Sequence, residues 1–226
     1  MFDELRHFAD TALVALAALL PIVDPLGGAP IYLAMTIGLT EAERARMAQL
    51  VAINSFALLV ASILIGAYVL DFFGVSIPAV QVAGGFVVCA IAWSLLTSPS
   101  TPAVSERSTS VTAEPLSQRA FYPLTMPLTV GPGSISVAIT LGANPPRNIR
   151  SIVATSVAHI AGVLIVSVSI YLCYRYADRI LRKLGTTGTN VLTRLIAFIL
   201  FCIGVQITWN GLHALIAGLL HPAAAS

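Results

Sequence analysis

The chain has 226 residues, of which 57% are hydrophobic and 10% are charged, with a formal net charge of +2. Its mean hydropathy of +0.89 lies far outside the range of soluble domains and predicts a membrane protein. The sequence contains no nucleotide-binding loop, haem motif or metal-ligating cluster. We therefore expect no cofactor, no metal ion and no nucleic-acid partner, and we do not expect an enzyme.

Six apolar segments are long enough to cross a bilayer, which takes about 20 residues of helix for a hydrocarbon core of roughly 30 Å. They cover residues 8–39, 47–70, 75–97, 119–143, 151–174 and 192–219. The sequence therefore predicts an all-α polytopic membrane protein with six transmembrane helices. Residues 1–10 lack the basic stretch of a cleaved signal peptide, so we expect the first segment to be retained.

The first and fourth segments each carry three prolines with the same spacing. These are Pro21, Pro25 and Pro30 in the first segment, and Pro123, Pro127 and Pro132 in the fourth. A proline removes a helical hydrogen bond and clashes with the preceding turn, and glycines beside it loosen the backbone. We therefore predict that the first helix of each half is broken inside the membrane.

The recurrence of the proline pattern predicts two copies of one three-helix unit. The first copy covers residues 1–97 and the second covers residues 119–226, and a Ser-, Thr- and Pro-rich segment, 98–118, joins them. We expect this segment to be a flexible cytoplasmic linker. Because each unit has an odd number of spans, the two copies must insert in opposite orientations, as inverted repeats.

Basic residues predict the orientation of the chain. Six spans place both termini on a side that holds Arg6, Arg147 and Arg150. The opposite side holds Arg44, Arg46, Arg107, Arg119, Arg175, Arg179, Arg182, Lys183 and Arg194. Since Lys and Arg accumulate in cytoplasmic loops, we expect both termini to lie outside.

The two breaks predict a site for a small zwitterion. Pro30 and Pro132 suit the first position of a second half-helix, where a missing N–H costs nothing. The backbone N–H groups of residues 27–29 and 130–131 would then face an anion. Carbonyl groups and Asp24 nearby would attract a cation. The alternative is a pair of kinks that only shape helix packing.

Ten residues are candidates for binding a substrate. They are Asp24, Pro25, Gly27, Gly28, Asn54, Thr129, Gly131, Gly133, Ser134 and His159. Asp24 is the only acidic residue deep in an apolar stretch, where a carboxylate is costly, so Asp24 and His159 are candidates for ion or proton coupling. A protonated Asp24 bonded to broken backbone, and interhelical hydrogen bonds from Asn54 and His159, are the structural alternatives.

At these motifs the chain resembles the MarC family, also called the neutral amino acid transporter family. The resemblance covers essentially the whole chain and rests on DPLGGAPIYLAMT at 24–36, MPLTVGPGSIS at 126–136 and LTRLIAFILFCIGVQ at 192–206. It implies six spans in two repeats, a bacterial inner membrane, and transport of small neutral amino acids such as glycine and alanine.

Three positions depart from the family pattern. The family motif usually reads NPIGNAP, so Asp24 and Gly28 stand where the family has asparagine, and Gln81 stands where it often has arginine. The change at Asp24 adds a titratable group. It leaves open whether the substrate and the coupling ion are those of better-known members.

The leading hypothesis is a secondary transporter of small neutral amino acids or related solutes, in which one repeat rocks against the other. Proton and sodium coupling both stay open. A non-transporting membrane scaffold or regulator is the alternative. A membrane-embedded hydrolase that uses Ser134 and His159 is a remote third reading, because the sequence has no GxSxG elbow.

The remaining signals concern partners and thiols. Cys89, Cys173 and Cys202 lie in apolar segments and form no CxxC pair, so we expect free thiols. The bilayer is the expected surrounding. Small residues such as Gly84 and Gly85 permit close helix contact, and the sequence does not decide whether that contact lies within one chain or in a homo-oligomer.

Overall fold

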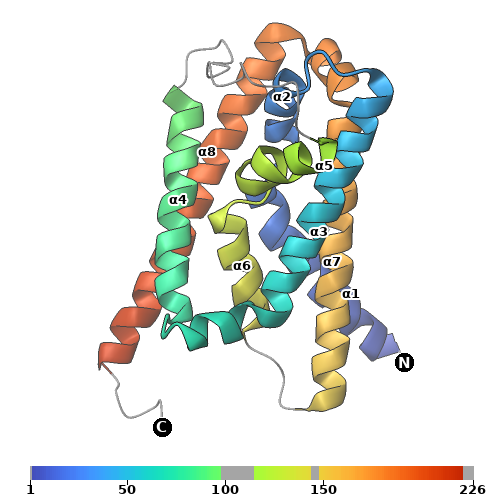
Figure 1. Cartoon of the computed structure of the whole chain (residues 1–226). Coiled ribbons are helices and arrows are strands. Elements are labelled where there is room, and N and C mark those ends of the chain that lie inside the picture. The colour runs from blue at the N-terminus through green and yellow to red at the C-terminus, as the bar shows by residue number, and fades with distance from the viewer. Residues whose placement is uncertain (1, 98–114, 144–147, 221–226) are drawn as a thin grey trace.

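The computed structural model describes residues 2–97, 115–143 and 148–220, and these residues form a helical bundle without strands (Figure 1). The elements are α1 (Phe2–Val23), α2 (Pro25–Met35), α3 (Glu41–Phe72), α4 (Ile77–Thr97), α5 (Leu116–Arg119), η1 (Ala120–Thr129), α6 (Pro132–Gly142), α7 (Ile149–Arg175) and α8 (Ala177–Leu220). Five helices of the described chain are long and apolar enough to cross a membrane, or six if α5–η1 and α6 count as one bent span. The prediction of an all-α polytopic membrane protein is confirmed.

Each predicted apolar segment contains helix, although α1 and α3 each begin six residues earlier than predicted. Two further differences concern α8 and α5. Helix α8 begins at Ala177, well before the predicted segment, and Gly185 interrupts it with a φ of 67°. Helix α5 begins at Leu116, inside the predicted linker. The rest of that linker, residues 98–114, lies outside the described residues, as do Arg107 and Arg147 of the charge count.

The first break lies at a single residue, Asp24, whose φ of 41° and ψ of 67° are left-handed. Pro25 follows at the first position of α2, where its missing N–H leaves no hydrogen bond unmade. Pro30 lies inside α2. The prediction that Pro30 opens the second half-helix was therefore wrong, because the chain already turns at Asp24.

The second break is longer. The π-helical segment η1 is interrupted at Tyr122 and Met126, which precede the cis prolines Pro123 and Pro127. The chain then bends by 74°, and α6 begins. Its first residue is Pro132, as predicted.

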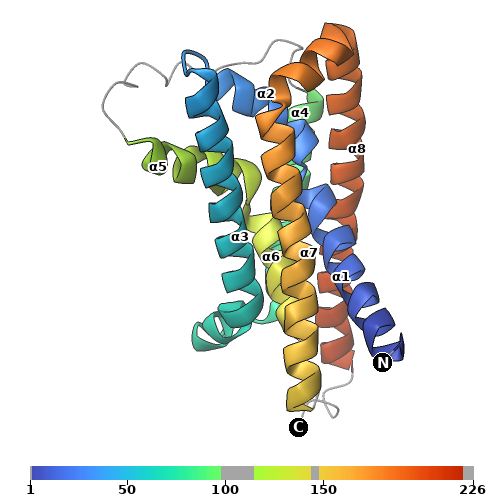
Figure 2. The same cartoon turned by 90° about the vertical axis from the view of Figure 1, so that its right-hand side faces the viewer.

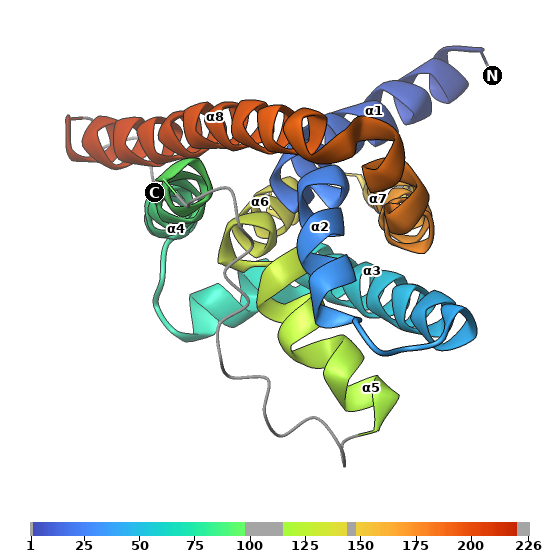
Figure 3. The ribbon, with the colours of Figure 1, turned by 90° about the horizontal axis from the view of Figure 1, so that it is seen from above.

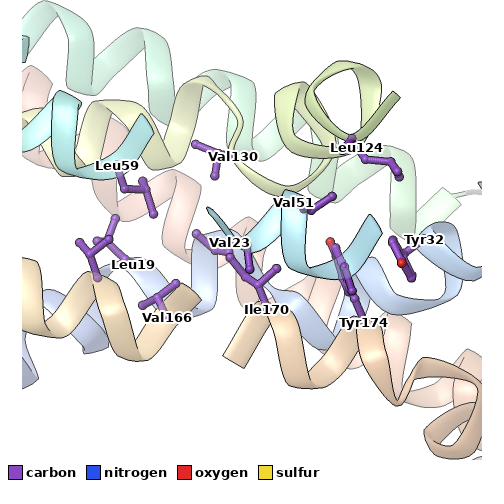
Figure 4. Packing of buried hydrophobic residues seen from close by; sticks show 14 of the residues in the cluster. Leu19, Val23, Tyr32, Val51, Leu59, Leu124, Val130, Val166, Ile170 and Tyr174 are labelled. Carbon is purple, nitrogen blue, oxygen red and sulfur yellow. The ribbon is translucent and has the colours of Figure 1, made fainter. Parts of the chain in front are cut away.

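Two clusters of buried side chains hold the bundle together. The larger one joins α1, α2, α3, η1, α6, α7 and the start of α8, and Figure 4 labels ten of its residues. The smaller one joins Val88 and Ala92 of α4 to Leu200 of α8. Outer apolar side chains such as Trp93 and Trp209 are more than half exposed, as expected where lipid replaces water.

The arrangement of the half-helices brings the two breaks into the interior of the bundle. Helices α1 and α6 occupy one half of its height, whereas α2 and η1 occupy the other half (Figures 1 and 2). Seen along the bundle, α2 and α6 lie near the centre, with α3, α4, α7 and α8 around them (Figure 3). The start of α1 and the end of α8 lie at the same end, together with the α3–α4 connection (Figure 1).

Candidate functional site

Both breaks face one cavity of about 100 Å³, several times the space that a water molecule needs. Seven of the ten predicted site residues line it: Asp24, Gly27, Gly28, Thr129, Gly131, Gly133 and Ser134. Residues of the two proline and glycine motifs, about a hundred residues apart in the chain, thus line the same cavity.

Three predicted residues do not line this cavity. Pro25 is buried at the start of α2, Asn54 is half-buried on α3, and His159 is buried on α7. The hydroxyl of Ser134 donates to the carbonyl of Gly131 at 2.9 Å. The structure therefore gives no support to a Ser134–His159 catalytic pair.

At the first break, Asp24 caps the helix that follows it. The N–H of Gly27 donates to Oδ1 of Asp24 at 2.9 Å, and the N–H of Gly28 donates to the Asp24 carbonyl at 3.0 Å. The expectation that these N–H groups are free for an anion was therefore wrong, because the side-chain carboxyl group and the backbone carbonyl of Asp24 accept from them. This wall of the cavity consequently favours a cation.

At the second break, the start of α6 has the opposite polarity. The N–H of Val130 was expected to be free, but it donates to the carbonyl of Thr125 at 2.8 Å. No side chain caps α6 in the part of the chain that the structure describes. Because Pro132 has no N–H, Gly133 and Ser134 supply the first backbone donors, and both line the cavity. A helix N-terminus carries a partial positive charge, so this wall favours an anion.

The third wall is apolar. It comes mainly from Val88, Ile91 and Leu95 of α4 and Leu200 of α8. Val88 packs so closely on α6 that a Cβ at Gly133 would overlap its Cγ2 methyl group. Glycine is therefore required at this position by the approach of α4.

Sequence reasoning missed this apolar wall, and it also missed Tyr174, which lies beside the cavity. It is fully buried, and its hydroxyl lies 2.9 Å from the hydroxyl of Thr129. Its sequence position, at the end of an apolar segment just before Arg175, is typical of a membrane-interface aromatic residue. No sequence pattern places it against the breaks, because that contact depends on how the two halves pack.

Comparisons with known proteins agree with the motifs. The chain matches the MarC family integral membrane protein model over residues 10–216. It is 32% identical over 210 residues to the UPF0056 inner membrane protein MarC of Escherichia coli strain K12, covering 90% of this chain and 94% of the relative. The protein of that name from Escherichia coli O1:K1 / APEC matches over the same shares at the same identity. No solved structure matches the chain.

Proposed function

The chain belongs to the MarC family of integral membrane proteins, and we propose that it is a secondary transporter of small neutral amino acids, or of solutes with the same charge pattern, in the bacterial inner membrane. One observation carries the proposal: the cavity has Asp24 on one wall and the uncapped start of α6 on another. A zwitterion would place its ammonium group at the first and its carboxylate at the second.

The walls of the cavity also favour a small, neutral solute. A second net charge would have to be desolvated against Val88, Ile91 and Leu200 without a partner, which is costly in an apolar site. The volume of about 100 Å³ accommodates a small solute. These features support glycine- or alanine-like substrates.

Helix packing supports the part of the proposal that concerns two inverted repeats. Exchanging the halves maps α1 onto η1, α2 onto α6, α3 onto α7 and α4 onto α8. Under this exchange the packed pair α1–α7 becomes the packed pair η1–α3. In the same way, α2–α7 becomes α6–α3, and α2–α8 becomes α6–α4. The pairs α3–α7 and α4–α8 map onto themselves. A pseudo-two-fold axis would therefore pass near the cavity, as in transporters with inverted repeats.

The test is uptake and counterflow of labelled alanine and glycine in proteoliposomes, with wild type beside Asp24→Asn. Asparagine can keep the cap and the left-handed turn, so the variant removes the charge alone. We expect saturable counterflow in the wild type and an apparent affinity about tenfold lower or worse in the variant, since a hydrogen bond to a charged group contributes roughly 1.5–3 kcal/mol. The matched control is Asp71→Asn, at an exposed position near the end of α3.

Two outcomes would contradict the proposal. Absence of counterflow for both solutes under every gradient would reject amino acid transport and favour a scaffold role. If a proton gradient drives uptake equally well in Asp24→Asn, Asp24 is not the coupling group. We expect that variant to lose gradient-driven uptake and to retain exchange.

A further inference from the structure

One tyrosine hydroxyl contacts both breaks, and we propose that Tyr174 is the gate residue that closes the cavity toward one end of the bundle. This end, here called the basic end, is where α3 begins and α7 finishes, and an ion pair of 3.6 Å joins Glu41 to Arg175 there. The inference rests on the proposed transport function, because a gate has a purpose only if solute passes.

The hydroxyl of Tyr174 is held by the second break. Its oxygen lies 2.9 Å from Oγ1 of Thr129. The hydroxyl of Thr129 itself donates to the carbonyl of Leu124 at 2.7 Å. Because a threonine hydroxyl has one proton, Tyr174 must be the donor. The bond therefore has a defined direction, from α7 into η1.

The same hydroxyl packs against the first break. A Cβ at Gly28 would come within 2.6 Å of it, so the oxygen lies directly on the backbone of the first turn of α2. Gly28 and Thr129 both line the cavity, and Tyr174 lies behind the wall that they form. Separating α2 from η1 would thus pull the hydroxyl away from at least one of them.

A column of packed groups continues from Tyr174 to the basic end. The Tyr174 ring stacks on Tyr32 of α2, with the ring centroids 4.4 Å apart and an interplanar angle of 13°, and Figure 4 shows the two side chains side by side. Both are fully buried. The hydroxyl of Tyr32 donates to the carbonyl of Arg44, near the start of α3, at 2.6 Å. This column joins α2, η1 and α7 at the side of the cavity nearest the basic end. In the proposed gate, a solute that leaves toward that end has to separate these contacts.

A gate makes a prediction that a purely structural tyrosine does not. Loss of one buried hydrogen bond shifts a two-state equilibrium by about two- to tenfold. If Tyr174 is a gate, the shift favours the open state, and access to the cavity increases from the basic end only. If the tyrosine only held the bundle together, loss of its hydrogen bond would increase access to the cavity from both ends.

The test measures access with a cysteine in the cavity. Leu128→Cys, at a half-buried lining position, is placed in a background in which Cys89, Cys173 and Cys202 are replaced by alanine. Modification by a membrane-impermeant methanethiosulfonate is timed from each side of oriented proteoliposomes. Tyr174→Phe keeps the ring stack and loses the bond, and Thr129→Val removes the same bond from the other partner. The control is Tyr176→Phe, at an exposed position on the same end.

We expect modification from the basic end to become about two- to tenfold faster in Tyr174→Phe and in Thr129→Val, with no further increase in the double variant. Modification from the other side should stay unchanged, as should both rates in the control. Unchanged access in both variants, or an equal gain from both sides, would overturn the gate. The assay needs no transported solute, so a directional gain without amino acid counterflow would retain the gate and reject the proposed substrate.

Discussion

Asp24 combines three roles that are usually divided among several residues. It turns the chain at a positive φ of 41°, caps α2 through Gly27, and lines the cavity. Asp and Asn tolerate the left-handed conformation because their short polar side chains bond to nearby backbone. The turn and the cap need only a side-chain oxygen, whereas attraction of a cation needs the negative charge.

This separation of roles gives a stability prediction. Asp24→Asn should unfold close to wild type, because the amide oxygen can still accept from Gly27. Asp24→Ala loses the cap, at a cost of roughly 0.5–2 kcal/mol, and must adopt a left-handed conformation that costs roughly 1–2 kcal/mol more. We expect a free energy of unfolding about 2 kcal/mol below wild type, measured by denaturant titration in detergent micelles. Equal losses in both variants would mean that the charge itself stabilises the fold.

At the level of residues, the sequence predicted what depends on local backbone chemistry. Proline and glycine marked both breaks and thereby the polar part of the cavity lining, but not its apolar wall. Pro30 was predicted to begin the second half-helix, but Pro25 does so, and either proline suits a helix start. The left-handed turn at Asp24 has no sequence signal that would have decided between them. Asn54 and His159 were selected for polarity alone, which does not tell which side of a helix faces the cavity.

At the level of elements, α6 is positioned by close backbone contact with α3. A Cβ at Gly142 would overlap the carbonyl oxygen of Ile63, and a Cβ at Gly66 would run into Ile139. Small residues of this kind let helices approach in a membrane, where packing rather than water drives association. Since α6 carries the donors of Gly133 and Ser134, this contact also fixes their place in the site.

Substitution at Gly142 should therefore be costly. In Gly142→Ala the new methyl group meets backbone, which cannot rotate away, so we expect α3 and α6 to separate at a cost of about 1–3 kcal/mol. The matched control is Gly218→Ala in α8, where a Cβ would have no neighbour within 4 Å and helix propensity favours alanine by up to about 1 kcal/mol. Thermal unfolding of both variants in detergent tests the difference. A Gly142→Ala protein as stable as the control would contradict the contact.

Helix length was less predictable than helix position. An apolar window finds the part of a helix that lies in hydrocarbon, and the polar, basic residues 177–191 therefore fell outside the sixth predicted segment although α8 includes them. The bend at Gly185 was not foreseen either, because an isolated glycine in a polar stretch is compatible with a helix, a turn or a loop.

At the scale of the whole molecule, positive charge gathers at the basic end. Arg44 and Arg46 lie near the start of α3, while Arg175, Arg179 and Arg182 surround the junction of α7 and α8. Arg175 forms an ion pair with Glu41, and Arg182 forms one with Asp178. The concentration of Arg at one end favours its cytoplasmic placement, and the gate at Tyr174 would then face the cytoplasm.

This orientation can be tested with two exposed positions in connections at opposite ends. Ile37, between α2 and α3, is 75% exposed, and Phe73, after α3, is 69% exposed. With the native cysteines replaced by alanine, Phe73→Cys should react with an impermeant maleimide in spheroplasts, whereas Ile37→Cys should react only in inverted vesicles. A permeant maleimide, as control, should modify both. The reverse result would place the termini in the cytoplasm. The column of Tyr174 and Tyr32 would then close the cavity against the outside, and the two gate variants would gain access from the outside instead of from the cytoplasm.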